Sequence, residues 1–261
     1  MLIIIGGHED IRGKRQILQQ FVDALGGEGA PVAVLAVATE HPQKAEALYR
    51  EAFAPWRLEL HFFSLAQRSL AWDPGTLARL KACQGFYFTG GDQLRITSLL
   101  GGTPAHQVIL QRFREGAVVA GTSAGASAMS AVMIVGGKER AAPALEAIRL
   151  SPGLGFIPEA VVDQHFAQRG RMGRLLSAVA QNPALLGIGI DENTALVIRG
   201  DEGDVVGEGT VVVVDGRTLE MSNVSELGPE EPLTLWGATL HVLSAGYGFH
   251  LADRRPKEKK L

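Results

Sequence analysis

Short apolar runs and amphipathic stretches alternate along the first half of the chain. The apolar runs lie at residues 2–5, 32–37, 58–62, 85–88 and 117–120. Between them, helical periodicity occurs at residues 14–25, 43–53, 73–81 and 104–115. Apolar runs without polar alternation are typical of parallel strands that are covered on both faces. The pattern therefore predicts an α/β fold, a three-layer αβα sandwich around a mainly parallel sheet.

The last third of the chain has a different pattern. Its apolar segments are close together and are separated by Gly, Asp and Asn, at residues 194–198, 205–206, 210–214 and 239–242. This spacing predicts antiparallel strands added at one edge of the same sheet. Because no repeat, low-complexity linker or composition shift divides the chain, residues 1–261 are predicted to form a single domain.

Composition and charge narrow the class of protein. With 46% hydrophobic and 20% charged residues, the chain has an ordinary globular composition. A net charge of −3 gives no electrostatic reason to expect nucleic acid or an anionic membrane as a partner. The single cysteine, Cys83, cannot form an internal disulfide. Since there is also no export signal and no apolar stretch of about 20 residues, we expect a cytoplasmic protein.

A turn of small residues carries the strongest chemical signal. Residues 121–125 read GTSAG and directly follow an apolar run. A G-x-S-x-G pattern between a strand and a helix is typical of a nucleophile elbow, whose small residues permit a sharp turn that exposes the serine hydroxyl. Ser123 is the predicted nucleophile, and the backbone N–H of Ala124 is a predicted oxyanion donor. A turn without catalytic function is the alternative.

A serine nucleophile needs a base, and the chain has seven histidines. Only His165 follows a predicted buried strand with a polar end, in the sequence VVDQHF at residues 161–166. Strand ends at one edge of a parallel sheet bind ligands in such folds, so His165 is the predicted base. The remaining histidines are predicted to have no catalytic function: His8, His41, His61, His106, His241 and His250.

A carboxylate that could orient His165 follows another predicted strand. Residues 187–194 read GIGIDENT, an apolar run that ends in charge. Successive side chains of an extended segment point to opposite faces, so Asp191 and Glu192 cannot easily both meet one imidazole. Either could stabilise the protonated histidine, and the spacing does not choose between them.

A glycine pair and a variable segment complete the predicted site. Gly90 and Gly91 follow the apolar run at residues 85–88, and the backbone N–H of Gly91 is a second predicted oxyanion donor. A tight turn, with Asp92 as N-cap of a helix at residues 93–100, is a compatible interpretation. Residues 136–152 are rich in Ala and Pro and are predicted to form a loop that could close over the site.

These motifs resemble one family of serine peptidases, which contains the cyanophycinases and the aspartyl dipeptidase peptidase E. The similarity rests on blocks that occur in the family's order: IIGGHED at 4–10, FTGGDQLR at 88–95, GTSAGA at 121–126, VDQHF at 162–166, RGRMGRLL at 169–176 and GIDENT at 189–194. Two positions differ, because the family motif has Ala and Lys where this chain has His8 and Ile11.

The resemblance implies a fold related to class I glutamine amidotransferases, a homodimer, and a Ser-His-Glu triad in which Glu192 is the acid. It implies cyanophycin as the substrate, a poly-aspartate chain that carries arginine on each side-chain carboxylate, cleaved in its α-peptide backbone to β-Asp-Arg dipeptides. The implied mechanism needs no metal or organic cofactor, and no Cys/His cluster has the spacing of a metal site. Six residues match the family's substrate pocket: Gln93, Asp163, Gln164, Arg169, Arg171 and Arg174.

The residue types of this pocket suit the polymer, because arginines hold carboxylates with bidentate hydrogen bonds and an aspartate can pair with a guanidinium. Two alternatives remain open. One is an aspartyl dipeptidase, closer to peptidase E, that acts on small Asp-containing peptides. The other is a binding protein without activity, which the complete set of Ser123, His165 and Glu192 disfavours.

Overall fold

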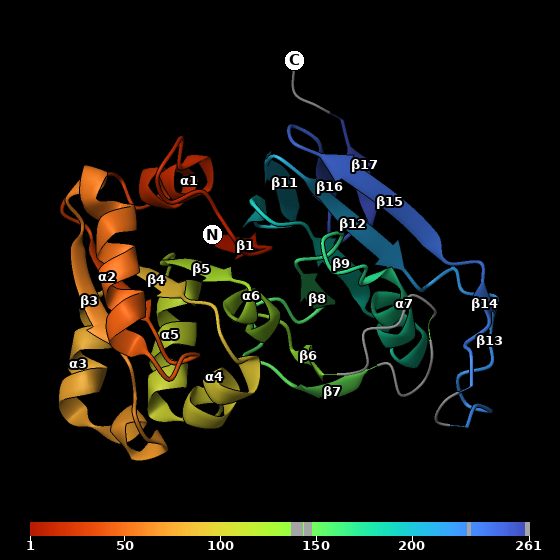
Figure 1. Ribbon diagram of the computed structural model, residues 1–261, viewed down its shortest axis with the longest axis horizontal. Helices are drawn as coiled ribbons and strands as arrows, with labels where there is room; N and C mark the ends of the chain where they lie inside the picture. Colours follow the sequence, from red (N-terminus) through yellow and green to blue (C-terminus); the bar gives the residue numbers. More distant parts are fainter. Residues whose placement is uncertain (137–142, 144–147, 229–230, 259–261) are drawn as a thin grey trace.

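The computed structural model describes residues 1–136, 143, 148–228 and 231–258. Five parallel strands form one part of a nine-stranded sheet, in the order β1-β5-β4-β2-β3 (Figure 1). The five predicted strands are confirmed with small shifts of their ends: β1 Leu2–Ile5, β2 Pro31–Leu35, β3 Glu59–Phe63, β4 Gly85–Phe88 and β5 Val118–Thr122.

Helices cover both faces of these parallel strands. Neighbouring residues of β1 and β4 belong alternately to the two hydrophobic cores, as an extended backbone requires. One core includes α1 (Gln16–Ala24) and α2 (Pro42–Phe53), and the other includes α3 (Pro74–Ala82), α4 (Gln93–Leu100), α5 (Pro104–Arg114) and α6 (Ala124–Ala128). The predicted αβα sandwich with a large parallel region is thereby confirmed.

Antiparallel strands extend the nine-stranded sheet on the other side of β1. They follow in the order β10, β11, β16 and β17, each antiparallel to its neighbour. Their bounds are β10 Thr194–Arg199, β11 Glu202–Gly207, β16 Gly248–His250 and β17 Arg255–Lys257. The predicted antiparallel edge is therefore confirmed for residues 194–198 and 205–206.

A separate four-stranded sheet has the order β15-β12-β9-β8. Its strands are β8 Ala160–Gln164, β9 Leu186–Ile190, β12 Thr210–Asp215 and β15 Thr239–Ser244. The prediction that residues 210–214 and 239–242 join the edge of the first sheet is wrong. The apolar side chains of β12 are buried on both faces. Val212 and Val214 pack with helix α7 (Met172–Gln181), and Val211 belongs to the core that includes α3, α4, α5 and α6. Such a strand is stabilised by pairing in a covered sheet.

Two short antiparallel pairs complete the fold, β6 (Val132–Gly136) with β7 (Arg149–Pro152) and β13 (Met221–Ser222) with β14 (Leu235–Trp236). The ends of the loop predicted at residues 136–152 are thus strand, and most of its middle lies outside the described residues. Among the helices that the structure describes, none has the length and apolar character needed to cross a bilayer.

Candidate active site

Strand ends from both sheets meet at the site. β1, β4 and β5 run parallel, so their carboxyl ends lie at one edge of the first sheet. Backbone hydrogen bonds attach the ends of β8 and β9 to the end of β1: His165 N–H donates to Gly6 O at 2.8 Å, and Asn193 N–H donates to Gly7 O at 2.8 Å. The two polar strand ends predicted from the sequence, at residues 163–165 and 191–193, are therefore brought together beside the end of β1.

Ser123 lies at the turn between β5 and α6, as the elbow motif predicts. Its backbone has φ 53° and ψ −112°, a conformation rare for a residue with a side chain. The neighbouring positions leave no space for a Cβ, because one on Gly125 would lie 2.4 Å from Phe88 O and one on Gly121 would lie 2.5 Å from Gly125 O. Small residues thus permit the turn that presents the serine hydroxyl.

His165 lies between the serine and a carboxylate. The distance from Ser123 Oγ to His165 Nε2 is 2.9 Å, and His165 Nδ1 lies 2.6 Å from Glu192 Oε1. The side chain of His165 is almost fully buried. Burial lowers its pKa below the ordinary value, and the hydrogen bond to Glu192 opposes this shift only in part. The lowered pKa favours the neutral imidazole, which is the form that can accept a proton.

The two neighbouring acids have different surroundings. Asp191 accepts hydrogen bonds from the backbone N–H groups of Ala167 and Thr210 at 2.9 Å each, and from Thr210 Oγ1 at 2.8 Å. Glu192 contacts His165 instead. Burial raises the pKa of Glu192, but hydrogen bonds from two histidines outweigh this and leave it below its ordinary value. Glu192 is therefore the carboxylate that contacts His165, whereas Asp191 binds the backbone of Ala167 and Thr210.

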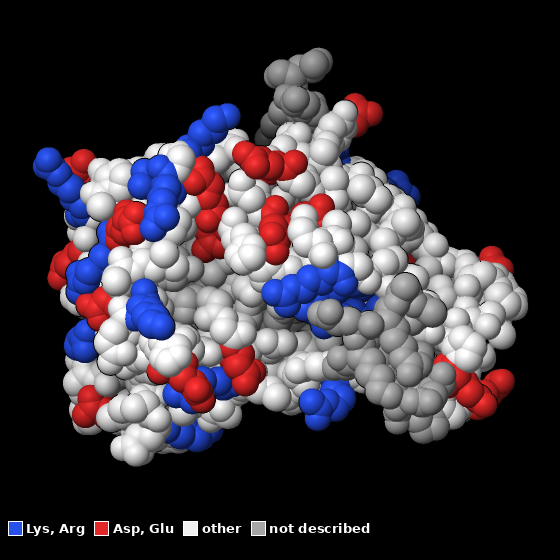
Figure 2. Space-filling model, viewed as in Figure 1, with Lys and Arg blue, Asp and Glu red and all other residues white. Residues whose placement is uncertain are grey.

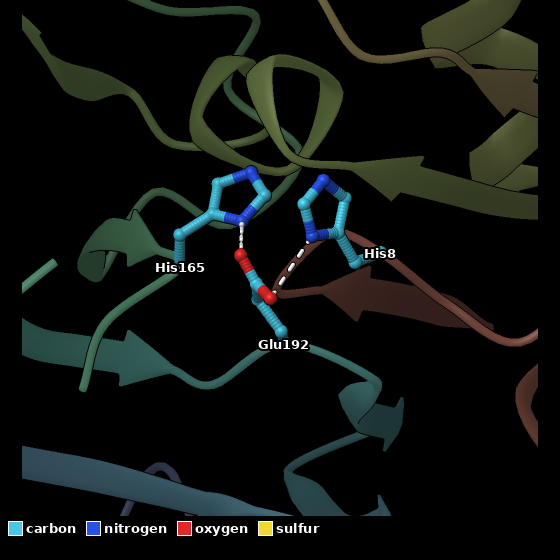
Figure 3. A group of neighbouring side chains, drawn as sticks. All are labelled: His8, His165 and Glu192. Atoms are coloured by element: carbon cyan, nitrogen blue, oxygen red, sulfur yellow. Dashed lines mark hydrogen bonds and ion pairs between the residues drawn. The ribbon is translucent and has the colours of Figure 1, made fainter. Parts of the chain in front are cut away.

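Two residues of the site were not predicted from the sequence. His8 Nδ1 lies 2.9 Å from Glu192 Oε2, and its ring is 5.0 Å from that of His165 (Figure 3). Its side chain is 71% exposed, so it is a surface residue at the edge of the triad. Both residues follow β1 in the sequence GGHED, a polar strand end of the kind that identified His165.

The second of them, Glu9, is buried and contacts Thr122, the residue before Ser123. It accepts hydrogen bonds from the hydroxyls of Tyr49 at 3.0 Å, Tyr87 at 2.7 Å and Thr122 at 2.5 Å. Burial, followed by the charge of Glu9, raises the pKa of both tyrosines well above their ordinary value. Since Thr122 precedes Ser123, this network holds the backbone at Ser123.

The predicted oxyanion donors lie near Ser123. Ala124 is the first residue of α6, where backbone N–H groups have no acceptor within the helix. On the other side, a Cβ on Gly90 would lie 3.3 Å from Ser123 Cβ, so the β4 strand end passes close to the nucleophile. Gly91 and Ser123 line the same cavity. The strand end that carries Gly91 and the first residue of α6 therefore both lie beside Ser123.

A cavity of about 910 Å³ opens at Ser123. Among the predicted substrate-binding residues, Arg169 lines it, and its charge helps to lower the pKa of His165. Further lining residues are His8, Glu9, Thr39, His41, Lys44 and Tyr49. On the face of the molecule that Figure 2 shows, Lys and Arg side chains lie near the middle and Asp and Glu side chains lie above them, so neither sign of charge dominates that face.

Three of the predicted substrate-binding residues, Asp163, Arg171 and Arg174, form ion pairs with one another. Asp163 is fully buried, and Arg174 binds its carboxylate with two N–H groups, Nε at 2.5 Å and Nη2. Arg171 lies 3.4 Å from the same carboxylate and donates to Gln164 O at 2.5 Å. These charges hold the end of β8, directly before His165.

The two predicted glutamines have separate surroundings. Gln93 donates from Nε2 to Ile134 O at 2.8 Å, which attaches α4 to β6. Gln164 is 5% exposed, and within the described residues its Oε1 has no hydrogen-bond partner. A buried acceptor without a donor is uncommon, and a ligand group could satisfy it.

An elbow serine, a buried histidine and a carboxylate joined in this order define the site as that of a serine hydrolase. The comparison with known families identifies the class further. The model of peptidase family S51 matches residues 1–206, and the chain belongs to this family.

Individual relatives are similar over nearly the whole chain. The cyanophycinase of Trichormus variabilis is 41% identical over 256 residues, which cover 97% of this chain and 86% of the relative. The cyanophycinase of Geminocystis herdmanii is 38% identical over 258 residues, with coverages of 98% and 95%. Among solved structures, a peptidase from an acI-B1 Actinobacterium has a TM-score of 0.68 and 24% identity, covering 95% of this chain and 96% of its own. That similarity supports the fold alone.

Proposed function

We propose that the protein is a serine peptidase that hydrolyses the poly-aspartate backbone of cyanophycin and releases β-Asp-Arg dipeptides. The observation that carries this proposal is the similarity to cyanophycinases at 36–41% identity over almost the full chain. The hydrogen-bonded series of Ser123, His165 and Glu192 supports it, because peptide hydrolysis requires an activated nucleophile.

In the proposed mechanism, Ser123 Oγ attacks the backbone carbonyl of an aspartyl unit while His165 Nε2 accepts its proton. The N–H groups of Ala124 and Gly91 stabilise the oxyanion, and one such donor contributes about 3 kcal/mol. His165 then protonates the leaving amine, and water releases the acyl group by the same steps. Glu192 holds the Nδ1–H tautomer of His165 and stabilises the imidazolium.

Substrate recognition is proposed to begin at Arg169, because this guanidinium lines the cavity beside the nucleophile. It would bind a carboxylate of the polymer by charge-assisted hydrogen bonds. The amides of Gln93 and Gln164 are proposed to contact the substrate as well. Direct contacts by Asp163, Arg171 and Arg174 would require their mutual ion pairs to open or to be shared, so their proposed contribution is to position the end of β8.

We also propose a cytoplasmic homodimer. Large apolar side chains are exposed near β14 and β15, namely Trp236, Leu240 and Val242, each more than half exposed. Exposed apolar side chains that lie together mark interaction surfaces. The mass of the protein in solution, measured by light scattering after gel filtration, would distinguish a dimer from a monomer.

The decisive experiment compares wild-type and Ser123→Ala protein incubated with cyanophycin, with products identified by mass spectrometry. We expect β-Asp-Arg from the wild type and none from the variant. A folded wild type that leaves the polymer intact would refute the proposal. Aspartyl dipeptides in a parallel incubation test the second activity, and their hydrolysis alone would indicate a peptidase E-like enzyme.

A further inference from the structure

Three side chains with metal-binding atoms meet at the triad. The ligand atoms of His8, His165 and Glu192 all lie within 4.8 Å of one another (Figure 3). They follow the ends of β1, β8 and β9, which are far apart in the sequence, so no ligand spacing along the chain reveals them. Glu192 already joins the two imidazoles, with one carboxylate oxygen directed at each.

The donor set suits Zn²⁺. Two imidazole nitrogens and one carboxylate oxygen, at about 2.0–2.2 Å from the ion, form a common three-ligand zinc site with a fourth position left open. The present spacings allow this geometry after small rotations of the side chains, and His8 is largely exposed and can move. His8 and His165 both line the cavity, so an ion can reach the cluster and an open position can hold water.

We propose that His8, Glu192 and His165 form an inhibitory Zn²⁺ site. The ion binds Nδ1 of His165, which in catalysis carries the ring proton toward Glu192. The proton that Nδ1 carries in the neutral ring is transferred through solvent to Nε2, so the ring stays neutral and changes only its tautomer. Nε2–H then donates to Ser123 Oγ, 2.9 Å away, and can no longer accept the serine proton. Zinc binding therefore removes the base and stops hydrolysis.

His8 decides whether the site forms. Without it, His165 and Glu192 supply two ligands, and the loss of one ligand from a three-ligand site removes much of the affinity. The zinc-binding part of the inference is independent of the substrate, whereas inhibition rests on the proposed peptidase function. The two parts are therefore measured separately.

Isothermal titration calorimetry with Zn²⁺ tests binding on wild type, Ser123→Ala, His8→Ala, Glu192→Gln and His41→Ala, after circular dichroism shows that each is folded. We expect one bound ion with equal affinity for wild type, Ser123→Ala and His41→Ala. His8→Ala and Glu192→Gln should each bind about tenfold or more weakly. His41 is the matched control, because it lines the cavity without belonging to the cluster. Equal affinities for wild type and His8→Ala would overturn the proposal.

Peptidase assays test whether bound Zn²⁺ inhibits hydrolysis. The rate of each variant with Zn²⁺ is compared with the rate of the same variant in the presence of a chelator. Zn²⁺ should inhibit the wild type, EDTA should restore it, and His8→Ala should need about tenfold or more Zn²⁺ for the same inhibition. Inhibition of wild type and His8→Ala at the same concentration would overturn the inference. If no variant hydrolysed cyanophycin, the proposed function would fail, while calorimetry would still decide the zinc site.

Discussion

The backbone of Gly7 lies against the imidazole of His165. A Cβ built on Gly7 would be 2.4 Å from His165 Cε1 and 2.6 Å from Nε2, closer than non-bonded atoms approach. The φ of Gly7 is +97°, a conformation that side-chain-bearing residues rarely adopt. Only glycine at this position leaves the imidazole of His165 within hydrogen-bond distance of Ser123.

Gly7→Ala should therefore displace His165 and inactivate the enzyme. We expect kcat/KM to fall roughly 100-fold, the effect of a misplacement of about 1 Å at a catalytic group. Gly26→Ala is the control for backbone strain, since Gly26 has φ +85° and nothing near the added Cβ. Kinetics and thermal unfolding of both variants make the comparison. Equal activity losses would show that strain alone, and not contact with His165, explains the effect.

Substitutions of the two neighbouring acids should have different consequences. Glu192→Gln keeps the shape of the side chain but removes the charge that stabilises the imidazolium, so kcat should fall by about 10³–10⁴ with little loss of stability. Asp191→Asn places an amide against backbone N–H donors and should cost about 1–3 kcal/mol in the free energy of unfolding. Denaturant unfolding and kinetics separate the two. A stable, inactive Asp191→Asn variant would contradict this assignment.

The sequence could predict the parallel strands but not the sheet to which the later strands belong. The run at residues 2–5 and its four parallel neighbours are recognisable because helical patterns separate them. The valines of β12 suit any buried sheet, whereas their pairing with β9 depends on contacts distant in the sequence. The pairing of β12 with β9 also explains why Asp191 and Glu192 have different partners, because it places Thr210 where its hydroxyl can donate to Asp191.

The meeting of Ser123 and His165 could be predicted because each stands at the end of a predicted parallel strand, where side chains gather at one edge of the sheet. His8 could not be predicted in this way, because its importance comes from its 2.9 Å contact with Glu192, which only folding creates. For two of the arginines, the sequence suggested a function that the contacts in the structure do not favour. Their spacing suggested a substrate site, but Arg171 and Arg174 are directed at buried Asp163, a contact that spacing does not encode.

The pH dependence of activity should report the lowered pKa of His165. Burial is the main cause of the shift, the charges of Arg169 and His8 add to it, and Glu192 opposes it. Only the neutral imidazole accepts the serine proton, so kcat/KM falls as the pH drops through this pKa. We expect the midpoint of the acid limb below the ordinary value of 6.5. The assay contains a chelator, and a midpoint above 6.5 would contradict the prediction.

Glu9 offers a test of the network that holds the nucleophile. Its carboxylate accepts three hydroxyl hydrogen bonds in a buried position, and Gln would replace one acceptor oxygen by an N–H₂ donor directed at these groups. Glu9→Gln should therefore cost about 1–3 kcal/mol in the free energy of unfolding and lower kcat through the displaced Thr122–Ser123 backbone. Tyr49→Phe removes a single donor and should cost only about 0.5–1.5 kcal/mol, with kcat nearly unchanged. Denaturant unfolding and kinetics of both variants test this order. A Glu9→Gln variant as stable and active as the wild type would show that the network does not hold Ser123.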